Sequence, residues 1–389
     1  MDLKSLACPL LLAGLIAASS PAAAEVRVGF VTTLSGPSAV IGQHMRDGFL
    51  LGLASLDGKL GGEPAEAIVV DDELKPDVAV ARVKALIERD RVDFIAGLAF
   101  SNVLLAVAKP VFEAETFLIG ANAGPSVLAG KGCSPWFFST SFQNDQIAEV
   151  VGTLANARGY RRMALLAPNY QAGRDMIAGF KRTFAGEVVE EIHAPMGALD
   201  FSAELARIAS LQPDAFFSFM PGGMGVQLVK QVRQSGINAL VPFISGFVID
   251  EATLPATGEA ALGLVAALHW SPSLDNPENR VFVERFEARF GYVPSYYAAQ
   301  GYDAARLIDG ALTKAGGKAA PKAAIRQALA SAPFKSVRGA FRFNGNGFPI
   351  QDFHEIEVER RADGKFQSRV VATLARDHAD AHAGNCKAR

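Results

Sequence analysis

Short apolar runs alternate with longer amphipathic stretches along residues 26–120. Short runs rich in Val, Ile and Phe are typical of strands that are buried on both faces of a parallel sheet. In one of the longer stretches, Val80, Val83 and Leu86 recur at helical spacing, whereas Arg82 points away from them. The pattern predicts strands at 26–31, 68–70, 94–97 and 117–120, and helices at 42–56, 76–90 and 101–114.

The same alternation begins again after residue 160. It predicts strands at 163–167, 188–192, 215–219 and 242–245, and helices at 172–185, 201–210 and 222–235. Two successive strand–helix–strand series imply two parallel sheets, each covered by helices on both faces. We therefore expect an α/β fold with two doubly wound domains.

The pattern changes beyond residue 270. Here we expect helices near 276–290, 296–315 and 321–330, followed by hairpin-like segments at 334–344 and 352–375. The Asn-Gly pairs of residues 344–347 favour a tight turn between these segments, because both residue types tolerate positive φ. No low-complexity linker separates the two halves, which favours several chain crossings over a flexible tether.

The first 24 residues have the pattern of a secretory signal peptide. Lys4 precedes an apolar run at 10–16, and the small residues at 21–24 offer a cleavage site before Glu25. The run is too short to span a bilayer, which needs about 20 apolar residues. Cys8 lies before the apolar run, which disfavours a lipid anchor. We expect cleavage after residue 24 and a soluble, periplasmic protein.

Charge and cysteine content narrow the function further. The chain has 38 Lys and Arg against 40 Asp and Glu residues, and such a near-neutral balance lacks the positive charge that is typical of proteins that bind nucleic acid or an anionic membrane. Cys133 and Cys386 remain after the leader. In an oxidising compartment they favour a disulfide, with two unpaired thiols as the alternative. A zinc site is disfavoured because neither has a second ligand at the usual spacing.

No catalytic motif is present. The sequence lacks a nucleophile elbow, a phosphate-binding loop and an H-E-x-x-H helix, and we expect neither cofactor, metal nor enzymatic activity. His378 and His382 lie close together in a polar segment. They could hold a metal loosely, but a solvated tail is the favoured interpretation.

Polar and aromatic residues follow the predicted strands. In open α/β sheets, ligands bind just beyond the carboxyl ends of the strands. Alternatively, Ser101 only caps its helix and the aromatic residues belong to the core. Five such loops from two domains favour a shared binding cleft. Its candidate residues are Phe100, Ser101, Asn102, Ala121, Asn122, Ala123, Tyr170, Met220, Gly246 and Phe247.

Three segments carry a resemblance to a known family. Residues 28–37 (VGFVTTLSGP), 71–79 (DDELKPDVA) and 294–305 (PSYYAAQGYDAA) resemble, in order and spacing, the periplasmic solute-binding proteins of ABC importers. The resemblance is to the branch that contains the leucine/isoleucine/valine-binding proteins, which have the type I periplasmic-binding fold. It implies two lobes joined by three hinge crossings, with residues 25–142 and 271–347 in lobe 1 and residues 143–270 and 348–389 in lobe 2.

The resemblance also implies roles for individual residues. Ser101 matches the hydroxyl that holds a ligand carboxylate, and Ala121 and Ala123 match residues that contact ligand through backbone groups. Tyr170 matches an aromatic residue at the cleft, and Met220 or its neighbour falls where the family has another tyrosine.

Two positions depart from the amino-acid binders of this family. Ile41 replaces an aromatic residue, and Gly246, beside Phe247, replaces the acidic residue that pairs with the ligand's ammonium. A buried ammonium without a counter-charge is unfavourable by several kcal/mol. The segment 133–138 (CSPWFF) and Cys386 are similar to a sub-branch that takes aromatic carboxylates such as benzoate or cinnamate.

The resemblance therefore implies a monomeric, extracytoplasmic receptor that binds a small carboxylate, most consistent with an aromatic acid, by hinge closure. Its partners would be membrane permease subunits coupled to cytoplasmic ATPases. The alternatives are a receptor for branched-chain or other amino acids, a ligand-sensing domain, or a secreted hydrolase. A sensor is usually fused to a further domain, and a hydrolase would need a nucleophile with its base, neither of which the sequence shows.

Overall fold

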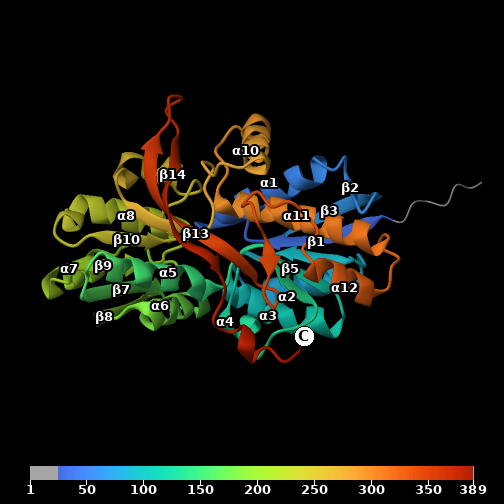
Figure 1. The fold of residues 1–389 in the computed structure, drawn as a ribbon, viewed down its shortest axis with the longest axis horizontal. Helices are drawn as coiled ribbons and strands as arrows, with labels where there is room; N and C mark the ends of the chain where they lie inside the picture. Colours follow the sequence, from blue (N-terminus) through green and yellow to red (C-terminus); the bar gives the residue numbers. More distant parts are fainter. Residues whose placement is uncertain (1–24, 389) are drawn as a thin grey trace, which may run out of the picture.

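The computed structural model describes residues 25–388, so the predicted signal peptide lies outside the described residues. The chain forms two lobes side by side, each built around one sheet (Figure 1). Lobe 1 contains the six-stranded sheet, in the order β2-β3-β1-β4-β5-β6. Its strands are β1 (Val26–Thr32), β2 (Lys59–Leu60), β3 (Glu63–Asp71), β4 (Phe94–Gly97), β5 (Phe117–Gly120) and β6 (Phe137–Ser139). β4 and β5 are buried along their whole length, as expected of central parallel strands.

Lobe 2 contains the second sheet, in the order β12-β13-β11-β10-β9-β7-β8, with β14 paired to β13. Its central strands run parallel, whereas β13 is antiparallel to β11 and β14. The strands are β7 (Arg162–Pro168), β8 (Glu187–Ala194), β9 (Ala215–Ser218), β10 (Phe243–Gly246), β11 (Val265–Leu268), β12 (Arg342–Phe343), β13 (Pro349–Arg360) and β14 (Phe366–His378).

Helices cover both sheets, which confirms the doubly wound α/β fold (Figure 1). The chain returns to lobe 1 after residue 270. The helices of lobe 1 and of this return segment are α1 (Ala39–Ala54), α2 (Pro76–Glu88), α3 (Ser101–Glu113), α4 (Ser126–Ala129), α10 (Pro277–Phe290), α11 (Tyr296–Ala315) and α12 (Lys322–Ala330). In lobe 2 they are α5 (Asn144–Ala157), α6 (Gln171–Thr183), α7 (Ser202–Leu211), α8 (Gly223–Ser235) and α9 (Leu254–Thr257), with short 3-10 turns η1 (Ile237–Ala239), η2 (Gly258–Ala261) and η3 (Ala383–Asn385). Among the described residues, no helix combines the length and apolar character that crossing a bilayer requires.

The sequence pattern did not predict β6, α5 and β11, and one predicted element is wrong. The segment 334–344 is not a hairpin, because only an isolated bridge joins Ser336 to Gly339. The Ser336 hydroxyl and the Val337 N–H instead donate to the carboxylate of Asp303, so they do not build a strand ladder.

A buried ion pair joins chain segments that cross between the lobes. The Arg338 guanidinium contacts Asp303 at 3.0 Å, and the two side chains are 3% and 0% exposed. Arg338 also donates to the carbonyl oxygens of Thr140 and Ser141, on the first crossing, and to Gln351, on the last. Burial raises the pKa of Asp303 and lowers the pKa of Arg338, so desolvation opposes the charges that their contact favours.

The C-terminal tail returns from lobe 2 to lobe 1. It leaves β14 and passes the end of α4 (Figure 1), where Cys386 forms a disulfide with Cys133 at a Cα–Cα distance of 5.6 Å. The interpretation of the tail histidines as solvated is wrong. His378 and His382 each contact a buried acid of α5, Glu149 and Asp145, at 2.8 Å. The hydrogen bond to Asp145 raises the pKa of His382.

Glycines allow α1 and α11 to pack with their backbones in close contact. A Cβ on Gly48 would overlap the carbonyl of Ala298, and a Cβ on Gly301 would overlap the carbonyl of Met45. This contact positions the N-terminal ends of both helices, which carry Ile41 and Tyr296, at the junction of the lobes.

We expect Gly301→Ala to lower the free energy of unfolding by about 1–3 kcal/mol, because the added methyl group has no space. The better helix propensity of Ala offsets only about 1 kcal/mol. Urea unfolding monitored by circular dichroism measures the change. Gly345→Ala is the matched control, since its Cβ would meet nothing within 4 Å. Equal stability of the two variants would contradict the close packing.

Candidate functional site

A cavity lies between the lobes, at the carboxyl ends of strands from both sheets. The space within it that is open to the centre of a water molecule is only about 20 Å³, so side chains nearly fill the cavity in this closed arrangement, and a ligand requires the lobes to part. On one side of it, the Gly223 N–H of α8 donates to the Pro37 carbonyl at 3.2 Å, so the two lobes are in direct contact. The cavity is lined by Ile41, Ala99, Phe100, Ser101, Asn122, Ala123, Phe142, Asn144, Tyr170, Ala172, Met176, Phe219, Pro221, Phe247, Tyr296 and Tyr297.

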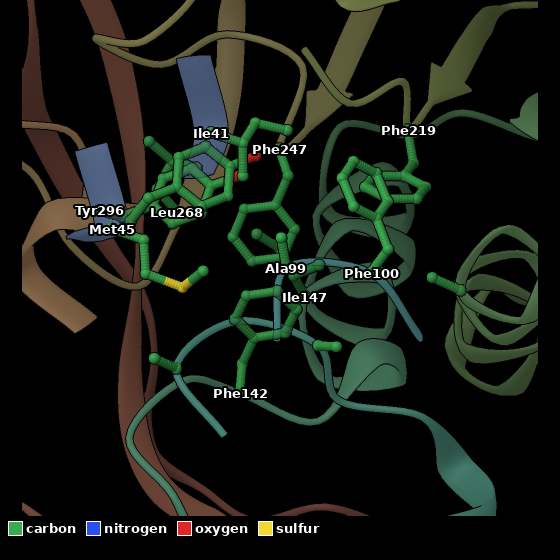
Figure 2. Packing of buried hydrophobic residues seen from close by; sticks show 14 of the residues in the cluster. Ile41, Met45, Ala99, Phe100, Phe142, Ile147, Phe219, Phe247, Leu268 and Tyr296 are labelled. Atoms are coloured by element: carbon green, nitrogen blue, oxygen red, sulfur yellow. The ribbon is translucent and has the colours of Figure 1, made fainter. Parts of the chain in front are cut away.

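Seven of the sixteen wall residues are aromatic, and they come from both lobes and the hinge; Figure 2 shows several of them. The Phe142 ring stacks on Phe247 with centroids 4.2 Å apart, and Phe247 lies 5.0 Å from Tyr296. On the opposite side, Tyr170 lies 6.4 Å from Phe100 and 6.3 Å from Phe219. Flat apolar walls of this kind suit a flat apolar ligand.

The polar groups of the wall are neutral. Ser101 is 1% exposed and begins α3, whose N-cap residue Phe100 makes no side-chain cap, so the first N–H groups of this helix lack intrahelical partners. The positive end of the α3 dipole therefore lies at Ser101. The Asn122 amide nitrogen donates to the Ala99 carbonyl at 2.7 Å, and its buried oxygen has no partner.

Burial keeps the three tyrosines of the wall in their neutral form. It raises the pKa of Tyr170, Tyr296 and Tyr297, so their hydroxyls remain protonated at neutral pH. No Asp, Glu, Lys, Arg or His side chain belongs to the wall. Asp250, outside it, is fully buried, and burial raises its pKa well above the ordinary range. The cavity thus offers hydrogen bonds and a helix dipole to an anion, and no counter-charge to a cation.

The structure brings most of the expected site residues to this cavity. Those in its wall are Ile41, Phe100, Ser101, Asn122, Ala123, Tyr170 and Phe247. Asn102, Ala121, Met220 and Gly246 lie outside it. The Ala121 N–H donates to Gly97, and a Cβ on Gly246 would lie 2.8 Å from the Phe217 ring, so this glycine faces the core of lobe 2. The contacts that each residue makes with a ligand remain predictions.

Sequence reasoning missed several wall residues. Phe142 and Asn144 follow β6, a strand that the pattern did not predict. The loop after β9 does reach the cavity, as predicted. Its wall residues are Phe219 and Pro221, however, and not Met220, which lies between them. Tyr296 and Tyr297 lie in the segment 294–305 that carries the family resemblance, but that resemblance does not assign them to the site. No sequence feature distinguishes Ala99, Ala172 and Met176 as residues of the site.

Comparisons with known proteins agree with this architecture. The family model described as "Periplasmic binding protein" matches residues 25–365. The "Leu/Ile/Val-binding protein homolog 6" of Brucella abortus is 28% identical over 385 residues, covering 96% of this chain and 97% of the relative.

Two solved structures are also similar. A solute-binding protein of an ABC transporter from R. palustris, in complex with benzoate, has a TM-score of 0.88 and 33% identity, covering 94% of this chain and 100% of that one. Another, from Rhodopseudomonas palustris BisB5 in complex with 3,4-dihydroxy benzoic acid, has a TM-score of 0.84 and 30% identity, covering 92% and 99%.

Family membership implies an extracytoplasmic location and association with ABC permeases. The matching family model and the similar structures are described as binding proteins. The chain therefore belongs to the periplasmic binding protein family, in its type I, leucine/isoleucine/valine-binding form, and is an ABC-type solute-binding receptor.

Proposed function

We propose that this receptor binds an aromatic carboxylate, of the benzoate or cinnamate kind, in the cavity between its lobes. One observation carries the proposal: the wall combines stacked aromatic rings with neutral hydrogen-bond donors and contains no charged side chain. The similar proteins solved with benzoate and with 3,4-dihydroxy benzoic acid support this ligand class, since both are at least 30% identical to this chain.

Binding begins on lobe 1 and is completed by closure. The Ser101 hydroxyl and the first N–H groups of α3 hold the ligand carboxylate, and lobe 2 then rotates about the hinge to place Tyr170 and Phe247 against the ring. Closure removes water from the carboxylate, which strengthens its hydrogen bonds. The ligand leaves chemically unchanged.

The cellular setting follows from the same proposal. Cleavage after residue 24 releases a monomer into the periplasm, where its closed form docks on permease subunits that cytoplasmic ATPases drive. The moving bodies are residues 25–142 with 271–347, and residues 143–270 with 348–389, except that β12 pairs with the sheet of lobe 2 and the disulfide holds the end of the tail on lobe 1.

A branched-chain amino acid is the second candidate, because the similar Brucella abortus protein is named a Leu/Ile/Val-binding homolog. Its ammonium group would enter a wall without a carboxylate. Leaving a charge of this kind unpaired costs several kcal/mol. The aromatic acid therefore remains the first candidate.

Calorimetry on the purified mature protein tests the ligand class. We expect benzoate, 4-hydroxybenzoate or cinnamate to bind, and leucine, isoleucine and valine to give no heat above dilution. Tight leucine binding with no response to any aromatic acid would reverse the ranking.

We expect Ser101→Ala to weaken aromatic acid binding about ten- to hundred-fold, the usual effect of losing a hydrogen bond to a charged group. The dissociation constant from calorimetry measures it. Ser210→Ala, at an exposed serine of α7, is the control and should bind as the wild type does. An unchanged affinity in Ser101→Ala would remove Ser101 from the site.

A further inference from the structure

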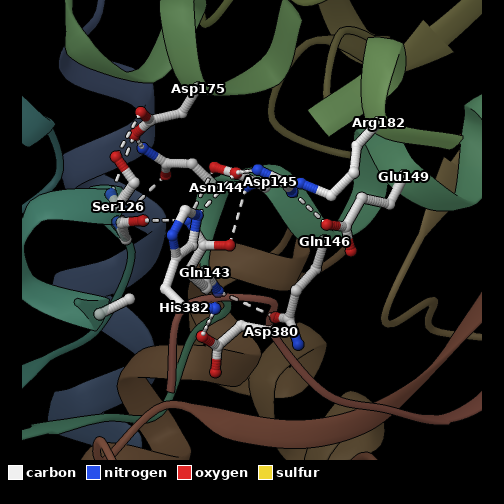
Figure 3. Close-up of polar contacts among 12 residues, drawn as sticks. Ser126, Gln143, Asn144, Asp145, Gln146, Glu149, Asp175, Arg182, Asp380 and His382 are labelled. Atoms are coloured by element: carbon white, nitrogen blue, oxygen red, sulfur yellow. Dashed lines mark hydrogen bonds and ion pairs between the residues drawn. The ribbon is translucent and has the colours of Figure 1, made fainter. Parts of the chain in front are cut away.

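Asp175 of α6 is a buried carboxylate whose partners are all neutral (Figure 3). It is 5% exposed, and within residues 25–388 no ion pair includes it. Its Oδ2 accepts hydrogen bonds from the Ser126 N–H at 3.0 Å and from the Asn144 amide at 2.9 Å. Its Oδ1 accepts from the Ser126 hydroxyl at 2.7 Å and from the Gln171 amide at 2.8 Å.

Half of these donors come from the other lobe. Asp175 follows β7 in lobe 2, whereas Ser126 begins α4, between β5 and β6 of lobe 1. Opening the cleft would replace both Ser126 donors by water. Asp175 therefore contributes to the closed arrangement of the lobes.

The Asn144 amide links Asp175 to the cavity. Asn144 uses one amide hydrogen on Asp175 and the other on the Ser101 hydroxyl oxygen, at 3.2 Å. Its carbonyl oxygen accepts from the Gly124 N–H at 3.2 Å. A carboxylate can only accept, so Asp175 requires the nitrogen side of the Asn144 amide to face it.

This orientation determines what Ser101 can do. Its oxygen accepts the hydrogen bond from Asn144, and within the described residues no protein group accepts its own hydrogen. The Ser101 hydroxyl is thus left to donate into the cavity. If Asn144 were reversed, its carbonyl oxygen would compete for that hydrogen.

We propose that Asp175 acts through Asn144 as a positioning residue: it makes Ser101 a hydrogen-bond donor and couples this polarity to lobe closure, so that the receptor prefers a carboxylate over its neutral amide. The proposal rests on the proposed function, in which Ser101 meets the ligand carboxylate. The role of Asp175 would explain how a wall without a cationic side chain selects an anion.

Asp175→Asn tests this relay from Asp175 through Asn144 to Ser101, with benzoate and benzamide as ligands in calorimetry. We expect benzoate affinity to fall about ten-fold or more and benzamide affinity to change much less, so that their ratio falls. Simple electrostatics predicts the opposite, since the substitution removes a negative charge near an anion. Asp200→Asn, at an exposed acid of lobe 2, controls for that loss of charge. An unchanged or higher ratio in Asp175→Asn would overturn the relay.

Ser126→Ala separates closure from polarity and guards against misfolding of the first variant. It removes a closure contact and leaves Asn144 in place, so both ligands should weaken by the same factor. A change in their ratio would contradict the assignment.

If no aromatic acid binds the wild type and leucine does, the proposed function fails. The same variants are then compared with leucine and leucinamide, for which the relay predicts the same fall in ratio.

Discussion

Arg338→Met is expected to lower the free energy of unfolding by about 3–5 kcal/mol, the usual result of removing one member of a buried ion pair. The substitution leaves the Asp303 carboxylate buried without its cation, and it removes the donors that join Thr140, Ser141 and Gln351. Urea unfolding measures the loss.

Two further variants make this result specific. Arg342→Met removes an exposed ion pair with Asp377 and should change the stability by no more than about 1 kcal/mol. Adding Asp303→Asn to Arg338→Met should recover part of the loss, because the amide needs no cation. A double variant that is less stable than Arg338→Met would contradict this explanation.

Removal of the disulfide by Cys133→Ser with Cys386→Ser is expected to cost about 2–5 kcal/mol of unfolding free energy. The bridge closes a loop with a sequence separation of 253, and loop entropy in the unfolded chain grows with length. Denaturant unfolding of the double variant measures the change.

The wild type in excess reductant is the matched comparison. It should unfold at the same denaturant concentration as the double variant, and reductant should have no effect on that variant. An oxidised wild type no more stable than the variant would show that the tail is held by its polar contacts alone. Those contacts include Asp380 with Asn344 and Asn346, and His382 with Asp145.

The fold was largely predictable because strands buried on both faces are apolar throughout, as in Phe94–Gly97. The start of α5 was not, since its run of Gln143, Asn144, Asp145 and Gln146 has the composition of a loop. In the structure the Gln143 and Gln146 side chains cap the helix reciprocally. β11 was missed because Val265–Leu268 contains two alanines and only one β-branched residue.

The site was predictable where it lies directly at a strand end. Ser101 and Phe247 follow β4 and β10, so the general rule for open sheets leads to them. Asn144 begins α5, just after the first hinge crossing, and Tyr296 begins α11, and no local pattern brings either one to the cavity. Their role depends on how distant segments pack.

The bridge between Cys133 and Cys386 also has a consequence for biogenesis. A polypeptide that is threaded through a membrane from its N-terminus exposes the first thiol long before its partner, which follows 253 positions later. If the predicted signal peptide exports this chain in that way, Cys133 stays reduced or bonded to another thiol while nearly all of both lobes emerges. Oxidation is then a finishing step of maturation that seals an assembled receptor, and it cannot guide the early stages of its folding.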